Sequence, residues 1–292
     1  MPTHISCIIK SFMIGMLLLL ATSGFAADSS NVLLQFMETE YTPVLSLLPT
    51  SMPLADSFKP SNQPFAGTII SFSGAAYVYH KNDNIVYTIK KNIPVFSGDT
   101  LVTGKKSRVI VQMSDESILT LTSQTKLTID RSLPRMKVRD TALQLFFGKV
   151  RALVKKLSGE YTVRTPTGSI GVRGTDFAIA VASAPPPKRQ AATGLLTAVL
   201  TGKSPSTVEL AGQFGPSVTV KPLSVAGVGM GEKAQEAAYV GAAALSVLEK
   251  ITEQPSPPAL PVKSVPSVSA SGPCWPFASK PEKLQYFKVC GP

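Results

Sequence analysis

Between Phe65 and Ala182 the sequence consists of short β-branched runs separated by turn residues, and no helical period persists there. Closely spaced short strands with intervening turns are typical of an all-β sandwich, barrel or solenoid. The crossover helices that a parallel α/β sheet needs between its strands are missing. The sequence therefore predicts an all-β fold of short stacked strands, with a solenoid-like or sandwich core and short flanking helices.

Ten strands are expected in this stretch. Asn82, Asp83 and Asn84 lie between two of the runs, and such residues favour the tight turn of a hairpin. A surface loop follows at residues 184–189, where three successive prolines supply no backbone donors. Strand-like runs then return and end near Ala226, so the β domain is expected over residues 65–226. The ten expected strands are Gly67–Phe72, Ala75–His80, Ile85–Lys90, Arg108–Met113, Ile118–Thr122, Lys126–Ile129, Ala142–Phe147, Lys149–Val154, Tyr161–Arg164 and Thr175–Val181.

Less regular segments flank this domain on both sides. Residues 27–64 are expected to contain a short amphipathic helix, residues 31–48, followed by an extended proline-rich linker. Residues 227–254 are expected to form a helix that begins near Glu232, because small apolar residues recur there with the helical period. A second proline-rich linker is expected over residues 255–273.

Residues 1–26 have the pattern of a secretory signal peptide. Lys10 precedes an uncharged apolar run, and small residues follow that run up to Ala26. The run is too short to cross a hydrocarbon core of about 30 Å, which needs roughly 20 apolar residues in a helix. We expect cleavage after Ala26, with an uncleaved anchor as the alternative. The mature chain would then have no transmembrane segment and would be periplasmic, or else extracellular or associated with the outer membrane.

Cys274 and Cys290 are the two cysteines that remain once Cys7 is removed with the signal peptide. In an oxidising compartment two such cysteines most often pair, which would close the tail formed by residues 274–292. A tetrahedral metal site is less favoured, because the tail has no histidine and no further cysteine pair to complete it.

The chain is basic, with 29 Lys and Arg against 18 Asp and Glu and a formal net charge of +11. Such a charge favours anionic surfaces, and export makes these lipopolysaccharide, acidic polysaccharide or an acidic protein rather than nucleic acid. If Lys149, Arg151 and Lys155 share one side of a strand, they form part of a basic face. The alternative is an ordinary solvated surface that keeps the protein soluble. The candidate basic face comprises Arg131, Arg135, Lys137, Arg139, Lys149, Arg151, Lys155 and Lys156.

Residues suited to catalysis are scarce. His80 is the single histidine after the signal peptide, and it is expected as a lone surface or turn residue at a strand end. A histidine-dependent triad or a multi-histidine metal site is therefore hard to build. The glycine-rich run at residues 227–231 lacks the lysine of a phosphate loop. We expect no catalytic residues, no bound metal and no cofactor.

The densest motif runs from Gly168 to Phe177. Its three glycines permit close backbone approach, bulges or positive φ. Arg173 and Asp176 are close enough in sequence to pair across a tight turn. We expect this motif to be structural rather than a ligand site. The structural-motif residues are Gly171, Val172, Arg173, Gly174, Thr175, Asp176 and Phe177, together with Gly98 and Asp99.

With Thr165, Pro166 and Thr167 in front of it, this motif resembles the hallmark segment of the FecR family. Earlier pieces occur in the order that the family has them. They are Gly67-Thr68-Ile69, the segment from Phe96 to Gly104, Ser114-Asp115-Glu116-Ser117 and Phe147-Gly148-Lys149-Val150. The resemblance covers residues 65–181 well and residues 194–226 loosely.

The resemblance implies a periplasmic, β-rich domain that recognises a partner. Full-length FecR regulators join such a domain to a cytoplasmic anti-sigma segment and one membrane helix, and they respond to an outer-membrane iron-siderophore receptor. A signal peptide stands where those two parts would be, so we expect no contact with a cytoplasmic sigma factor. We expect a non-catalytic interaction or signalling scaffold with a protein partner in the envelope. The alternative is a protein that binds lipopolysaccharide or peptidoglycan through the basic face.

Overall fold

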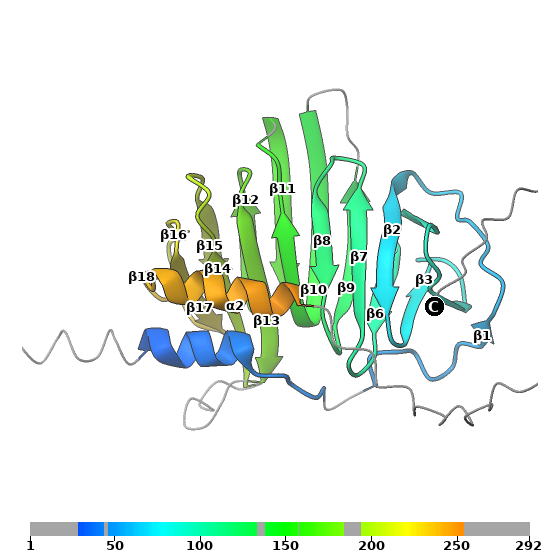
Figure 1. Cartoon of the computed structure of the whole chain (residues 1–292), viewed down its shortest axis with the longest axis horizontal. Helices are drawn as coiled ribbons and strands as arrows, with labels where there is room; N and C mark the ends of the chain where they lie inside the picture. Colours follow the sequence, from blue (N-terminus) through cyan, green and yellow to red (C-terminus); the bar gives the residue numbers. More distant parts are fainter. Residues whose placement is uncertain (1–28, 44–45, 133–137, 157, 184–193, 254–292) are drawn as a thin grey trace, which may run out of the picture. The chain divides into compact units, whose positions relative to one another are not determined.

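The computed structural model describes residues 29–43, 46–132, 138–156, 158–183 and 194–253 (Figure 1). Within these residues it is all-β with two short flanking helices, as the sequence predicts. The expected signal peptide, the loop at 184–189, the linker at 255–273 and the tail with Cys274 and Cys290 lie outside the described residues.

The strands form two sheets that share β10 (Val138–Leu153) and are mostly antiparallel. Sheet A contains, in order, β1 (Leu54–Ala55), β4 (Val86–Thr88), β3 (Ala76–Tyr79), β6 (Thr100–Thr103), β9 (Lys126–Ser132), the first part of β10, β11 (Ser158–Thr165), β12 (Gly168–Val172), β15 (Val208–Gly212) and β16 (Val218–Val220). Sheet B contains β5 (Pro94–Phe96), β2 (Phe65–Ser73), β7 (Arg108–Met113), β8 (Ile118–Leu121), the second part of β10, β13 (Asp176–Ser183), β14 (Leu195–Thr201), β17 (Ser224–Gly229) and β18 (Ala238–Tyr239).

Strand β10 passes from one sheet to the other at Gly148. Up to Phe147 it pairs with β9 of sheet A, and from Gly148 onward it pairs with β13 of sheet B. Gly148 has φ +95°, a value that side chains with a Cβ rarely adopt. A Cβ there would also lie 2.5 Å from Cα of Thr125. The two strands expected over residues 142–147 and 149–154 are therefore one strand, bent at a position that requires glycine.

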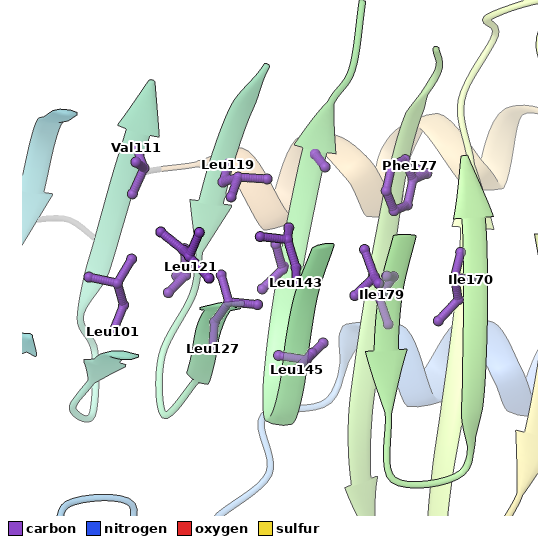
Figure 2. Packing of buried hydrophobic residues seen from close by; sticks show 14 of the residues in the cluster. Leu101, Val111, Leu119, Leu121, Leu127, Leu143, Leu145, Ile170, Phe177 and Ile179 are labelled. Atoms are coloured by element: carbon purple, nitrogen blue, oxygen red, sulfur yellow. The ribbon is translucent and has the colours of Figure 1, made fainter. Parts of the chain in front are cut away.

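The main core lies between the two sheets, where apolar side chains from both form one cluster. Side chains of a strand alternate between its two faces, and on β13 Phe177, Ile179 and Val181 point into this cluster. Figure 2 shows Phe177 and Ile179 in the layer between the strands, with Leu127, Leu143 and Ile170 from sheet A and Leu119 from sheet B. Full burial of each such side chain stabilises the fold by about 1.5–3 kcal/mol.

A second core lies on the outer face of sheet B, under the two helices (Figure 1). The N-terminal helix (residues 29–38) contributes Leu33, Phe36 and Met37, and α2 (Ala242–Thr252) contributes Ala244, Val247, Leu248 and Ile251. The sheet presents small residues here, such as Ala178 and Ala180 on β13. At Gly227 a Cβ would lie 2.7 Å from Cδ2 of Leu33. Small side chains on this face therefore let the helices approach the sheet closely.

The flanking segments differ from the sequence expectation. The helix expected over 227–254 covers Ala242–Thr252 alone, because β17 extends to Gly229 and the chain then returns as β18. Ala234, which fits the helical period, is buried in the core between the sheets instead. The expected helix at 31–48 occupies residues 29–38. The proline-rich linker contains β1, which pairs in parallel with β4.

Candidate interaction site

Strand β12 carries the first half of the glycine-rich motif and divides it between two faces. Ile170 and Val172 point into the core between the sheets. Gly171 and Arg173 therefore lie on the outer face of sheet A, where both are exposed. Gly171 pairs with Thr162 of β11 on one side and with Glu209 of β15 on the other.

A hollow of about 360 Å³ lies over Gly171 on this outer face. The side chains around it include Glu160, Arg173 and Glu209, all exposed. None of these three makes an ion pair with any residue in the described part of the chain. Thr162 and Thr207 also line the hollow. The hollow thus offers two carboxylates and one guanidinium to solvent.

Gly171 has no conformational or steric need to be glycine. It is not among the residues with positive φ, and a Cβ built on it meets no atom within 4 Å. Gly174, three residues later, contrasts with it. There φ is +85° and a Cβ would lie 2.5 Å from Cα of Lys156. The absence of a side chain at Gly171 keeps the hollow open. At Gly174 the absence of a side chain allows the backbone to lie close to the backbone of Lys156.

The second half of the motif holds the fold together. Phe177 is buried in the core between the sheets, and the carbonyl of buried Thr175 accepts a hydrogen bond from the amide of Val154. Asp176 accepts two hydrogen bonds from Arg151, at 2.9 Å from Nε and 2.7 Å from Nη2.

The pairing expected between Arg173 and Asp176 is therefore wrong, because Arg151 on the neighbouring strand β10 occupies the carboxylate. Arg151 also donates from Nη1 to the carbonyl of Leu248 at 2.9 Å and to the hydroxyl of Thr252. A cation near the C-terminal end of a helix offsets the negative end of its dipole. Asp176 thus holds the guanidinium of Arg151 in place, and Arg151 in turn binds the end of α2 to sheet B.

Gly98 and Asp99 form a second, buried centre with His80. Gly98 has φ +89°, and its amide donates to the carbonyl of Ile129. Oδ1 of Asp99 lies 2.6 Å from Nδ1 of His80, and Oδ2 accepts the amide of Phe96 at 2.8 Å. Asp99 is fully buried. The Gly-Asp pair therefore positions a carboxylate inside the fold.

The expectation that His80 is a lone surface residue is wrong, since it is 6% exposed and lies among the rings of Phe58, Tyr87 and Phe96. Its Nε2 lies 2.8 Å from the carbonyl of Lys59. Both ring nitrogens face acceptors, an arrangement that only the doubly protonated imidazolium satisfies in full. His80 is buried because the proline-rich linker places Phe58 and Lys59 against its imidazole ring, which the sequence did not reveal.

Three effects set the pKa of His80. Burial alone lowers the pKa, but the hydrogen bonds to Asp99 and Lys59 and the charges of Asp99 and Asp83 outweigh it. The pKa of His80 therefore lies above its ordinary value. Burial raises the pKa of the Asp99 carboxyl as well, although the hydrogen bonds from His80 and Phe96 oppose that effect. The folded state thus binds protons at this pair more tightly than the unfolded chain does.

The structure places the candidate basic residues in different surroundings. Lys149 and Arg151 point to the outer face of sheet B, where Lys149 is 8% exposed and Arg151 binds Asp176 and α2. Lys155 pairs with Glu116, and exposed Arg131 on sheet A pairs with Asp140. Lys156 is exposed. Arg135, Lys137 and the side chain of Arg139 lie outside the described residues. The helices cover the part of the face that Lys149 and Arg151 were expected to present to solvent.

Among the residues that the structure describes, no group of three or more His, Cys, Asp and Glu side chains has a geometry that holds a metal ion. No helix in the same part of the chain has the length and apolar character to cross a membrane. The sequence analysis missed Glu160 and Glu209 as site residues. Each lies next to a buried residue of its strand, Tyr161 or Val208, so the alternation of side chains marks both glutamates as outward-facing. That they lie close to Gly171 depends on the strand register, which the sequence alone does not give.

Known proteins resemble part of this chain. Residues 99–203 match the family model of the FecR protein. Two crystal structures of a proposed anti-sigma factor from Parabacteroides distasonis ATCC 8503, at 1.65 and 2.50 Å resolution, are similar, with 14% sequence identity and TM-scores of 0.37 and 0.36. Each similarity covers 48% of this chain and 59% of that one, which is less than two thirds of its length. No curated protein matches the sequence. The segment that matches the FecR family model, residues 99–203, includes Gly171 and Arg173.

Proposed function

We propose that this chain is an exported, non-catalytic interaction protein of the bacterial envelope, which binds a partner protein through the hollow over Gly171. The FecR match supports a regulatory, signalling-related protein rather than an enzyme. The expected signal peptide at residues 1–26 supports a periplasmic location.

The observation that carries this proposal is the exposure of Gly171 and Arg173 in the middle of a motif whose other residues are structural. Arg173 makes no hydrogen bond or ion pair with the described residues, and Gly171 leaves room for an incoming side chain. Glu160 and Glu209 give the hollow an excess of one negative charge on a chain whose net charge is +11. Charge complementarity therefore favours a basic side chain of the partner, with Arg173 available to a partner carboxylate.

The experiment is site-specific crosslinking in the envelope of the native host. A photoreactive amino acid replaces Thr207, on the rim of the hollow, and the crosslinked proteins are identified by mass spectrometry. We expect one protein partner, which is lost when Gly171→Leu fills the hollow. The matched control is Ser169→Leu, which adds the same side chain on the same face of β12, two residues away and outside the hollow.

Loss of the crosslink in Gly171→Leu but not in Ser169→Leu supports the proposal, provided that both variants unfold at the same urea concentration as the wild type. An identical crosslink in both variants would refute the hollow as the binding site. Salt-sensitive binding to purified lipopolysaccharide in place of any protein crosslink would refute a protein partner.

A further inference from the structure

A second cavity, of about 190 Å³, lies on the opposite sheet from the hollow, where the two helices meet sheet B. The N-terminal helix and the residues after it provide Met37, Glu38 and Glu40, and α2 and its end provide Val247, Lys250, Ile251 and Glu253. The sheet provides the floor. Its lining residues are Lys106, Ser107, Arg108, Thr122, Ser123 and Lys149.

Two cations in this cavity are more than nine-tenths buried. Arg108 is 6% exposed and Lys149 is 8% exposed. Arg108 donates from Nη2 to the carbonyl of Ile251 at 2.8 Å and from Nη1 to the carbonyl of Thr252. Its Nε is buried and has no hydrogen-bond partner among the residues that the structure describes. Buried polar groups of native proteins are almost always hydrogen-bonded, so an unused donor here needs an explanation.

The ammonium of Lys149 also lacks a direct partner. Within the described part of the chain it makes no ion pair and no side-chain hydrogen bond. Burial lowers the pKa of Lys149 to about 8, although the charges of Glu40 and Glu38 act to raise it. At neutral pH the lysine is therefore still mostly protonated. A buried charge without a partner destabilises the folded state, and an incoming anion would offset that cost.

The acidic residues of the cavity lie at its rim. Glu38 is exposed and pairs with Lys250 at 2.7 Å, which leaves it largely neutralised. Glu40 and Glu253 are exposed. Glu253 acts on Arg108 through its charge, but Arg108 uses its two terminal nitrogens for the carbonyls at the end of α2. The floor therefore keeps a net positive charge, with Lys149 and Nε of Arg108 as free donors.

We propose that this cavity binds a small oxyanion, of the size of phosphate or a short carboxylate, between Lys149 and Arg108. Charge-assisted hydrogen bonds from an ammonium and a guanidinium are the common means of holding such anions in proteins. The volume of about 190 Å³ is sufficient for a small ion. The lining of the cavity comes from sheet B and from both helices, so a bound anion would link the N-terminal helix and α2 to sheet B. This site is independent of the hollow over Gly171.

The first experiment uses the full wild-type chain and compares sodium phosphate, sodium acetate and sodium chloride at equal ionic strength and pH 7. Acetic anhydride acetylates accessible amines, and mass spectrometry measures the rate at each lysine. We expect phosphate or acetate to slow the acetylation of Lys149 several-fold relative to chloride, with no change at exposed Lys156. Equal protection of Lys149 in all three salts would overturn the proposal.

The second experiment measures the affinity for inorganic phosphate by thermal shift. Lys149→Met keeps the approximate length of the side chain and removes its charge, and we expect binding to weaken at least about ten-fold. Lys156→Met is the control and should bind as the wild type does. Unchanged binding in Lys149→Met would refute the site. If that variant does not fold, the protection of Lys149 in the wild type decides the question alone.

Discussion

Gly148 is a position where a single methyl group should strongly destabilise this fold. It is the residue at which β10 leaves sheet A and enters sheet B. In Gly148→Ala the new Cβ would lie 2.4 Å from Oγ1 and 2.5 Å from Cα of Thr125, and 2.7 Å from the carbonyl oxygen of Gln124. Two of these three atoms belong to the backbone, so no side-chain rotation relieves the contact.

Three effects determine the size of the loss. An alanine at φ +95° costs about 1–2 kcal/mol relative to glycine. Overpacking against a fixed backbone adds about 1–3 kcal/mol. Movement of Thr125 would break the hydrogen bond that its Oγ1 accepts from the amide of Lys149, at 3.0 Å, which contributes about 1 kcal/mol. We expect the free energy of unfolding to fall by about 3–6 kcal/mol, a large part of the stability of a typical domain.

Urea denaturation followed by fluorescence measures this loss. Gly171→Ala is the matched control, because it places the same methyl group on a strand glycine that has ordinary φ and no neighbour within 4 Å of the new atom. We expect it to change the free energy of unfolding by less than about 1 kcal/mol, toward greater stability. Equal losses in the two variants would refute the argument that Gly148 is required by the crossing of β10.

Three further predictions concern the attached helices and the buried histidine. Arg151→Met should lower the free energy of unfolding by about 2 kcal/mol and speed amide hydrogen exchange in α2, because it removes the half-buried ion pair with Asp176 and the hydrogen bonds to the end of the helix. Unchanged hydrogen exchange in α2 would contradict the proposal that Arg151 holds this helix on sheet B. Leu248→Ala should lower the free energy of unfolding in urea by about 2–4 kcal/mol, since this side chain of α2 is 1% exposed in the second core. A loss below about 1 kcal/mol would argue against the second core. The folded-state pKa of His80 lies above the ordinary value of 6.5, so its stabilisation is complete below that pH and is lost as the pH rises through the folded-state pKa. In urea denaturation at a series of pH values, His80→Gln should reduce the change in the free energy of unfolding between pH 5 and 9. If the variant shows the same pH dependence as the wild type, other groups cause it.

The sequence was sufficient to predict an all-β fold, because burial on one face of a strand leaves a two-residue period. Runs such as residues 175–181 carry that period, and the structure places Phe177 and Ile179 inside and Ala178 against the helices. The same run does not reveal that its outer face is also covered. Alanine is compatible with a solvated and with a packed surface, so the second core had no clear signal in β13 itself.

Other features depend on pairings between distant residues. The choice of Arg151 rather than Arg173 as the partner of Asp176 follows from the register of β10 with β13. The hollow over Gly171 depends in the same way on the register of β12 with β11 and β15. Register is set by the packing of whole strands. A local motif could therefore identify the candidate residues but not the partners of each one.

The position of the two helices has a consequence for the order in which the chain folds. Leu33, near the beginning of the described residues, packs against Gly227 and shares a cluster with Leu248 near their end. Contacts between such distant residues form slowly, because a long loop must close first. The N-terminal helix is synthesised first, yet its docking surface is complete only after β17 has joined β14. Its apolar face must stay unaggregated until then, so this helix is where a chaperone would have the longest time to act on the nascent chain.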